Sequence, residues 1–292
     1  MKTAHGRPWG SSSKRRRKVT LMGFPRRMQT PPRNRAVMAV LPLSIAFLLL
    51  FSAGCARFKG PPAGPPMSER QVEEALSGLQ EQEGKVSSFY SRGNLLMKNW
   101  YAEEESGIVI AGSRDPFRIK IEVTHAWGQP ILHVLIDRGK LEVLSFQEST
   151  LYTGDFTPEA LSRFLPGPLS PELIWSALRG YPIVSPHRKV LSPEADRIEL
   201  YDTGNEKVET IQFGRETRHP ERVVMPRQQV ALSFSDFAES DGIFYAREVE
   251  VDHRKSRGKL LLKVEKAVFN RPVPNEVFTL DKPPGFMVSR LE

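Results

Sequence analysis

Strict alternation of apolar and polar residues recurs in short segments along much of this chain. From Phe117 to Val123 every second residue is apolar and the residues between are charged, and the same spacing returns at 198–200, 211–213 and 230–234. Side chains two residues apart lie on the same face of a strand, so each segment predicts a strand with one buried face. Alternation over many segments favours an antiparallel sheet with one dry face.

Turn signals separate these segments and indicate hairpins. The sequences "DRGK" at 137–140, "DTGNEK" at 202–207 and "SRGK" at 256–259 each join two apolar runs. We therefore expect successive strands to lie side by side in a meander. The acidic run at 103–105 is interpreted as a solvated turn between two strands.

A few segments predict helices instead. Residues 68–84 open with a capping box, Ser68 and Gln71, and continue with apolar residues at helical spacing. Two shorter segments within 157–182 each begin with a cap residue, Thr157 or Ser170, followed by proline. We predict that residues 68–292 form one α+β domain, mainly β with a few helices, built on a strongly curved antiparallel sheet.

A different composition precedes this domain. Residues 36–54 carry no charge, follow Arg33 and Arg35 and end in small residues, which is the pattern of an export signal. An uncleaved transmembrane helix is the alternative, because about twenty apolar residues span a bilayer. Either way we expect the rest of the chain to be exported. We interpret residues 1–54 as a leader and signal peptide, and Met28 begins a stretch that is a complete signal by itself.

The charge of the chain changes at the same boundary. Residues 1–54 hold eleven Lys and Arg and no acidic residue, whereas residues 55–292 hold 31 basic and 34 acidic side chains, a net charge of −3. The formal net charge of +8 therefore comes from the leader. A nucleic-acid partner is not expected, because nucleic-acid binding draws on basic charge in the folded part.

The single cysteine, Cys55, directly follows the small residues at 52–54. This stretch resembles the lipobox of bacterial lipoproteins, whose cysteine is lipidated on sulfur and becomes the N-terminus. The resemblance implies a membrane anchor at Cys55; a free buried thiol is the alternative. Residues 55–67 would then be the lipidated cysteine and a tether rich in Pro and Gly, a composition that stays extended.

Motifs for chemistry are missing from the sequence. It contains no HExxH pair, no GxSxG elbow, no P-loop and no dinucleotide-binding glycine pattern. We therefore expect no catalytic residue, no metal, no cofactor and no enzyme activity, with a hydrolase acting on envelope polymers as the remaining enzyme alternative. The apolar face of a curved sheet covered by helices favours a cavity for lipid chains, unless that face simply packs as core.

Further residues resemble the LolA/LolB-like superfamily of bacterial outer-membrane lipoproteins and their relatives. Arg92 and Gly93 are similar to the entry to its first strand, and the segment from Leu169 to Pro182, with Trp175, is similar to its helix and Gly-x-Pro turn. The resemblance implies an incomplete β-barrel with a helical lid around an apolar cavity, in a LolB-like receptor or an uncharacterised relative. It also implies a lipid-anchored protein of the outer membrane that faces the periplasm and binds acyl chains of lipids or lipoproteins.

Two groups of residues are candidates for this function. The first occupies apolar positions of the early strands and of the helix after residue 170 and would line the acyl-chain cavity: Leu95, Met97, Phe117, Ile119, Ile121, Val134, Ile136, Leu173, Trp175 and Leu178. The second is the loop "HAWGQPI", whose Trp127 and Ile131 are candidates to contact a membrane or a partner; a plain buried hairpin is the alternative. The alternative function is a structural or assembly lipoprotein that contacts an envelope protein without a lipid ligand.

Overall fold

The computed structural model describes residues 64–98, 103–165, 167–254 and 258–291. The predicted leader, the lipidation site at Cys55 and most of the predicted tether lie outside these residues. Within them, the chain forms a single sheet of fourteen strands with three α-helices and one short 3-10 helix. The predicted fold class, mainly β with a few helices, is confirmed.

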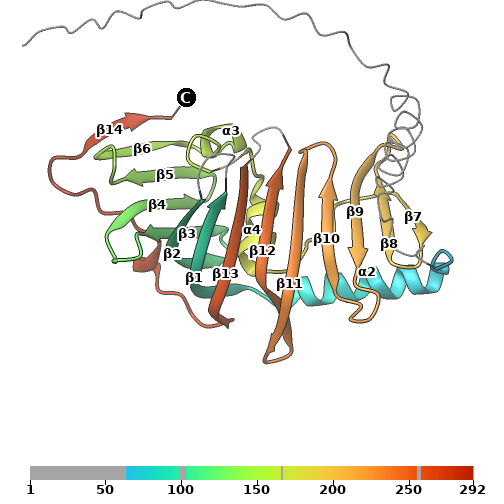
Figure 1. The fold of residues 1–292 in the computed structure, drawn as a ribbon. Helices are drawn as coiled ribbons and strands as arrows, with labels where there is room; N and C mark the ends of the chain where they lie inside the picture. The colour runs from blue at the N-terminus through green and yellow to red at the C-terminus, as the bar shows by residue number, and fades with distance from the viewer. Residues whose placement is uncertain (1–63, 99–102, 166, 255–257, 292) are drawn as a thin grey trace, which may run out of the picture. The chain divides into compact units, whose positions relative to one another are not determined.

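The sheet is built outward from its middle. Its order is β14-β6-β5-β4-β3-β2-β1-β13-β12-β11-β10-β9-β8-β7. The chain therefore starts at β1, runs strand by strand to β6, crosses to the far edge at β7 and returns to β13 beside β1 (Figure 1). The strands are β1 (Ser88–Lys98), β2 (Glu103–Ser113), β3 (Arg118–Thr124), β4 (Pro130–Asp137), β5 (Lys140–Ser145), β6 (Thr150–Asp155), β7 (Lys189–Glu194), β8 (Arg197–Tyr201), β9 (Lys207–Phe213), β10 (Pro220–Met225), β11 (Val230–Ser240), β12 (Ile243–His253), β13 (Gly258–Phe269) and β14 (Met287–Arg290).

The predicted meander is confirmed in each half of the sheet, where consecutive strands pair antiparallel. Two pairings were not predicted: β13 pairs antiparallel with β1, and β14 adds to β6 in parallel. The acidic run at 103–105 was also interpreted wrongly, because β2 begins at Glu103. Glu104 and Glu105 pair with Met97 and Leu96 of β1, so cross-strand pairing extends the hairpin through residues whose local composition resembles a turn.

The sheet is strongly curved and does not close. In Figure 1 the strands near β6 run across the direction of those near β11. A register shift at Arg92 and Gly93, where β1 pairs with β13, is one source of bending. A Cβ on Gly93 would lie 1.9 Å from the carbonyl oxygen of Lys263, so the close approach of the two backbones requires glycine at this position.

Three helices are added to the sheet, and each begins where the sequence predicts, although α3 ends after only four residues. They are α2 (Glu69–Gly84), α3 (Pro158–Leu161) and α4 (Pro171–Arg179). Ser68 Oγ accepts a hydrogen bond from the amide of Gln71 while Gln71 Oε1 accepts one from the amide of Ser68, which completes the capping box. In α3 and α4 the hydroxyl of the cap residue, Thr157 or Ser170, accepts a hydrogen bond from the amide three residues later.

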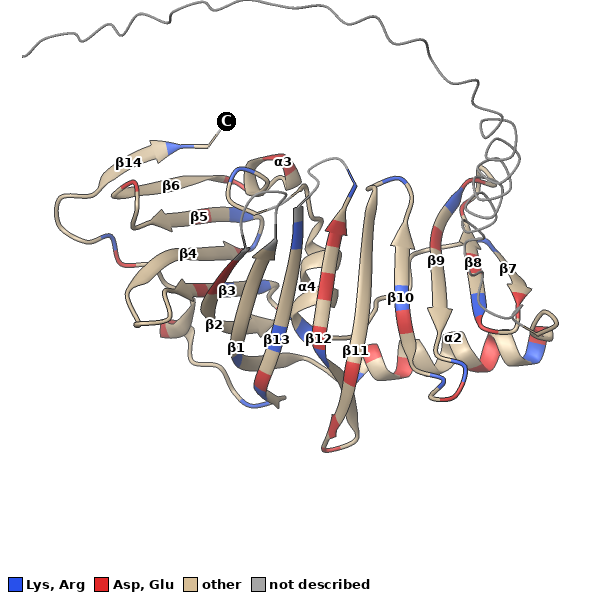
Figure 2. Cartoon of the chain, in the orientation of Figure 1, with Lys and Arg blue, Asp and Glu red and all other residues tan. Residues whose placement is uncertain are grey.

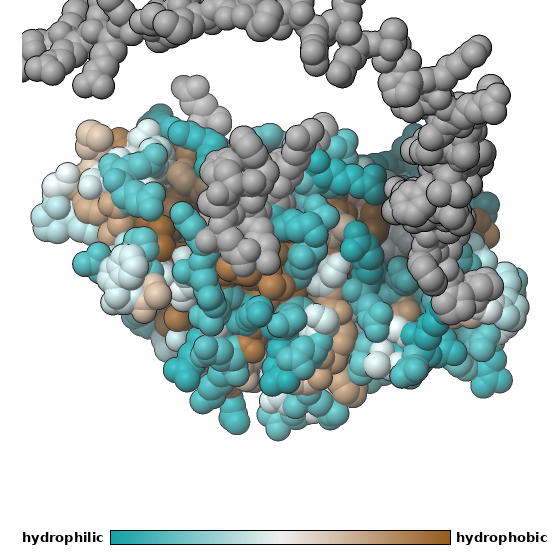
Figure 3. Space-filling view, in the orientation of Figure 1, coloured by the Kyte–Doolittle hydropathy of each residue, from teal (hydrophilic) through white to brown (hydrophobic). Residues whose placement is uncertain are grey.

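The two faces of the sheet differ in what covers them. The inner face carries the main apolar core together with α2 and α4, which lie behind the strands in Figure 1. The outer face is mainly hydrophilic (Figure 3) and carries cross-strand ion pairs such as Lys259–Glu250 at 2.7 Å. A small second core lies on that face, where the 3-10 helix η2 (Asn275–Phe278) covers Ala111 and Leu135.

Candidate functional site

An apolar cavity lies between the inner face of the sheet and α4. All fifteen lining residues are Leu, Ile, Val or Ala, and the surface of the cavity is entirely apolar. Its volume is about 50 Å³, whereas pockets that hold small ligands measure roughly 300–1,000 Å³. The cavity is therefore almost filled by side chains in this conformation. It is lined by Leu95, Ile108, Ile121, Val123, Leu132, Val134, Leu165, Leu169, Ile174, Ala177, Leu178, Val249, Val251, Leu260 and Leu262.

The C-terminal end of α4 is tied to the rest of the domain. Gly180 ends the helix in the left-handed conformation, with φ of 76°, and its carbonyl accepts a hydrogen bond of 2.7 Å from the amide of Ala246. The neighbouring Arg179 is buried, donates to the carbonyl of Gln82 in α2 at 2.6 Å, and lies over the ring of Tyr181. Burial lowers the pKa of Arg179 to about 10. These contacts hold one end of α4 against α2 and β12.

At the other end of α4, residues 162–165 and 167–169 precede the helix without forming a helix or strand. Leu165 and Leu169, which precede the helix, both line the cavity. Between them Gly167 has a φ of 92°, and a Cβ at this position would lie 2.6 Å from the ring of His253. The chain thus packs tightly against β12 while two leucine side chains occupy space beside the sheet. The small volume of the cavity follows in part from this segment.

The ten residues predicted to line a cavity fall into three groups. Leu95, Ile121, Val134 and Leu178 line the cavity described above. Phe117 and Trp175 line a separate open groove of about 420 Å³ beside α4. The remaining four are placed in or against the packed core: Ile119, Ile136, Leu173 and, half-buried, Met97. Contact with an acyl chain stays a prediction for all ten.

Several lining residues were not among those predicted. Val249 and Val251 alternate with acidic residues in "EVEVDH", and Leu260 and Leu262 occupy alternate positions of β13. Their alternation would have placed them on a buried face. Nothing local indicates which part of that face stays unfilled, because that depends on how β12 pairs with β13 and how β13 pairs with β1.

The loop with Trp127 lies at the β3–β4 hairpin. The Trp127 side chain is 70% exposed, and its ring stacks on His125 with ring centroids 4.4 Å apart. Ile131 is half-buried, and its carbonyl accepts a hydrogen bond from the amide of Phe146 at the end of β5. The structure therefore separates the two predicted contact residues, since Trp127 faces solvent and Ile131 belongs to the sheet.

One acidic side chain is buried on the inner face away from the cavity. Glu209 of β9 is fully buried, and its Oε2 accepts a hydrogen bond from the amide of Ser185 at 2.7 Å. Its Oε1 has no hydrogen-bond partner among the described residues. Burial raises the pKa of Glu209 above its ordinary value. The carboxyl group ties the connection between α4 and β7 to the sheet and does not line the cavity.

The described residues contain no group of three or more His, Cys, Asp or Glu side chains placed to bind a metal ion. In the same part of the chain, none of the helices has the length and apolar character needed to cross a bilayer.

Comparison with known proteins gives similarity at the level of structure only. No family model matches this chain, and no curated protein matches it in sequence. A DUF1329 family protein from Desulfovibrio piger is 12% identical over 72% of this chain and 96% of its own, with a TM-score of 0.48. A LolA superfamily protein from Nitrosomonas europaea is 14% identical over 71% of this chain and 97% of its own, with a TM-score of 0.46.

A domain from Vibrio parahaemolyticus assigned to outer membrane lipoprotein sorting is 12% identical over 71% of this chain and 97% of its own, with a TM-score of 0.45. These TM-scores lie below 0.5, and the fold described above rests on this chain's own strand pairing. The expected kinship with a LolB-like receptor stays a prediction.

Proposed function

We propose that this chain is a lipid-anchored protein of the outer membrane that faces the periplasm and binds acyl chains of lipids or lipoproteins between its sheet and α4. In this role it would serve the sorting or biogenesis of envelope lipoproteins. The observation that carries the proposal is the wholly aliphatic lining of the cavity. Burial of hydrocarbon stabilises a complex by about 0.8 kcal/mol per methylene and needs no polar partner.

Binding would require the cavity to open, because its present volume of about 50 Å³ is too small for a long acyl chain. Arg179 and Gly180 tie the C-terminal end of α4 to α2 and β12. Among the described residues, the opposite end, with Leu165 and Leu169, forms no hydrogen bond to α2. We therefore expect these two leucines to leave the sheet first and an acyl chain to take over their apolar contacts.

The remaining parts of the proposal concern the membrane. Lipidation of Cys55 would anchor the chain, residues 56–67 would serve as the tether, and residues 68–292 would form the binding domain. Trp127, exposed at a hairpin tip, would contact the membrane or a partner during transfer, because an indole ring suits an interface with one apolar and one wet side.

Mass spectrometry of the chain extracted from membranes tests the proposal. We expect acyl lipid to co-purify with the full chain in native spectra, in addition to lipid covalently bound at Cys55. The variant Ala177→Phe should lose this lipid, because the larger side chain fills the cavity from α4. Circular dichroism must show that the variant keeps its sheet. Absence of bound lipid from the wild-type chain would contradict acyl-chain binding.

A second candidate function is a structural or assembly lipoprotein that contacts an envelope protein without a lipid ligand. The observation in its favour is the same small volume, since an interior filled by the chain's own side chains has little room for a ligand. Site-specific crosslinking from Trp127 in intact cells distinguishes the two candidates. A single protein adduct together with lipid-free protein would favour the assembly role.

A further inference from the structure

A second concave surface lies far from the cavity in the sheet order, between α2 and the edge strand β7. This groove, which we call the α2–β7 groove, has a volume of about 660 Å³ and is open to solvent. Its walls combine five apolar side chains with two carboxylates: Met67, Val72, Leu76, Val190 and Leu191, with Glu69 and Glu73. The α2–β7 groove is larger than the aliphatic cavity beside α4 and, unlike that cavity, carries charged side chains.

The apolar wall of the α2–β7 groove is only partly covered by the chain itself. Leu191 is 43% exposed, and Val72 and Val190 are half-buried although both pack against the main core. Leu76 lies below them and is buried. A ligand that brought apolar side chains into the groove would therefore remove further hydrocarbon surface from water.

Two carboxylates of the groove, Glu69 and Glu73, have no cationic partner among the described residues. Glu69 and Glu73 are exposed, stand four residues apart on α2, and form no ion pair within the part of the chain that the structure describes. Like charges at this spacing repel each other. Glu69 gains from the positive end of the helix dipole, whereas Glu73 lies beyond the first turn.

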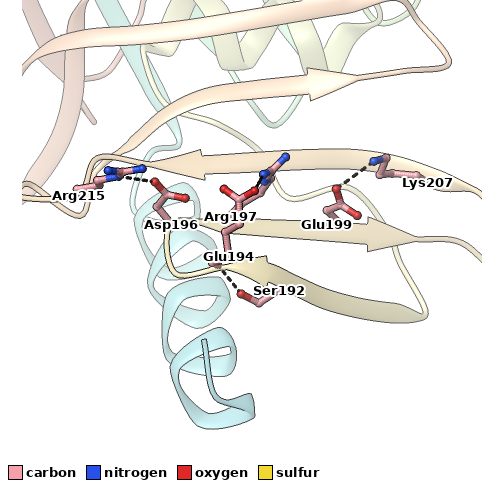
Figure 4. Close-up of polar contacts among 7 residues, drawn as sticks. All are labelled: Ser192, Glu194, Asp196, Arg197, Glu199, Lys207 and Arg215. Atoms are coloured by element: carbon pink, nitrogen blue, oxygen red, sulfur yellow. Dashed lines mark hydrogen bonds and ion pairs between the residues drawn. The ribbon is translucent and has the colours of Figure 1, made fainter. Parts of the chain in front are cut away.

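The neighbouring strands show the opposite arrangement. The carboxylates on strands β7 and β8 and on their connecting turn each have a cation: Glu194 with Arg197, Asp196 with Arg215, and Glu199 with Lys207 (Figure 4). Figure 2 shows acidic residues along α2. Unpaired negative charge at this edge of the sheet is thus concentrated on α2, beside exposed apolar surface.

From this combination we propose that the α2–β7 groove docks a segment of a partner protein that carries Lys or Arg beside apolar residues. The apolar side chains would cover Val72, Val190 and Leu191, and the basic ones would pair with Glu69 and Glu73. An anionic membrane surface is disfavoured at this site, because the same carboxylates repel it. The inference is independent of acyl-chain binding and concerns a different part of the domain.

Peptide binding to the full chain in phosphatidylcholine nanodiscs tests the inference. The probe is a short Lys/Leu peptide with a helical apolar repeat, and its comparison is a Glu/Leu peptide of the same repeat. We expect the Lys/Leu peptide to bind, to bind more weakly as salt is added, and to protect the amides of α2 and β7 from hydrogen exchange. The Glu/Leu peptide should not bind.

Two variants localise the binding. Glu69→Lys combined with Glu73→Lys should weaken the Lys/Leu peptide about tenfold, the change expected when roughly 1.4 kcal/mol of exposed charge pairing is lost. Glu239→Lys combined with Glu265→Lys is the matched control, since both are exposed carboxylates outside the groove, on β11 and β13, and it should leave affinity unchanged. Both variants should keep the circular dichroism of the wild-type chain.

Three results would overturn the inference. The first is equal affinity of the Lys/Leu peptide for the wild-type chain and the double variant. The second is binding without protection of α2 and β7. The third is protection of the α2–β7 groove in the absence of peptide, in phosphatidylcholine or phosphatidylglycerol nanodiscs, which would mean that a membrane, a second copy or another part of the chain already fills it.

Discussion

Truncation of Leu169 to alanine should enlarge the cavity and allow the chain to bind a fatty acid more tightly. Leu169 is 4% exposed and lines the cavity of about 50 Å³. Removing its three outer carbons loses about 2.4 kcal/mol of burial free energy, at about 0.8 kcal/mol per carbon. The void left behind lowers the stability further, by about 24 cal/mol per Å³. We therefore expect a total loss of about 3–5 kcal/mol in the free energy of unfolding, within the range of such substitutions.

Thermal unfolding with and without a long-chain fatty acid measures both effects. Without ligand, Tm should fall by about 6–20 °C, since about 1 kcal/mol shifts Tm by about 2–4 °C in a domain of this size. Fatty acid should raise the Tm of Leu169→Ala more than that of the wild-type chain, because ligand stabilises the folded state that it binds.

The control for this variant is Leu200→Ala. Leu200 is a fully buried leucine of β8 that does not line the cavity. It should lose comparable stability and gain no response to fatty acid. Equal responses of the two variants, or no response from Leu169→Ala, would refute the assignment of the cavity as the place where acyl chains enter.

Three further predictions concern other parts of the domain. Gly93→Ala should lower the free energy of unfolding by about 1–3 kcal/mol or more, because the new Cβ meets the backbone of Lys263; a denaturant midpoint equal to that of wild type would contradict this. Stability should fall as pH rises from the ordinary pKa of 4.5 through the raised pKa of Glu209, because over that range the folded chain holds a proton that the unfolded chain releases. Urea titrations across pH should show this decline for wild type and not for Glu209→Gln, and identical pH profiles would exclude the effect. Trp127→Ser should change stability by less than about 0.5 kcal/mol, because the side chain is 70% exposed, and should weaken binding to lipid vesicles in co-sedimentation; unchanged vesicle binding would remove Trp127 from the membrane contact.

The elements of this domain could be predicted from sequence because their signals are local. Alternating residues identify the strands, and Ser68 with Gln71 sets the start of α2 through hydrogen bonds between residues three apart. Thr157 and Ser170 do the same for α3 and α4. Gly180 and Pro182 mark the end of α4. Glycine readily adopts the left-handed conformation that ends the helix, and proline two residues later cannot continue it.

The candidate site was predictable only in part. Alternation assigns Ile119 and Ile121 to the same face of β3, yet the first is packed in the core and the second lines the cavity. Which apolar side chains leave space between them depends on the position of α4 and on the two leucines that precede it. Those positions follow from contacts between segments far apart in the chain, such as Arg179 with Gln82.

The sequence by itself determined most of the strands with their apolar faces and the start of each helix, because these depend on side chains a few residues apart. Only the tertiary structure decided that β13 closes onto β1, that β14 joins β6 in parallel, and that the cavity is nearly filled. It also decided that Glu209 is buried and that Glu69 and Glu73 line the same groove as Leu191. Strand register, cavity volume and ion pairing depend on contacts between segments far apart in the chain, as where Phe89 pairs with Phe269, 180 residues later. No local pattern specifies such contacts.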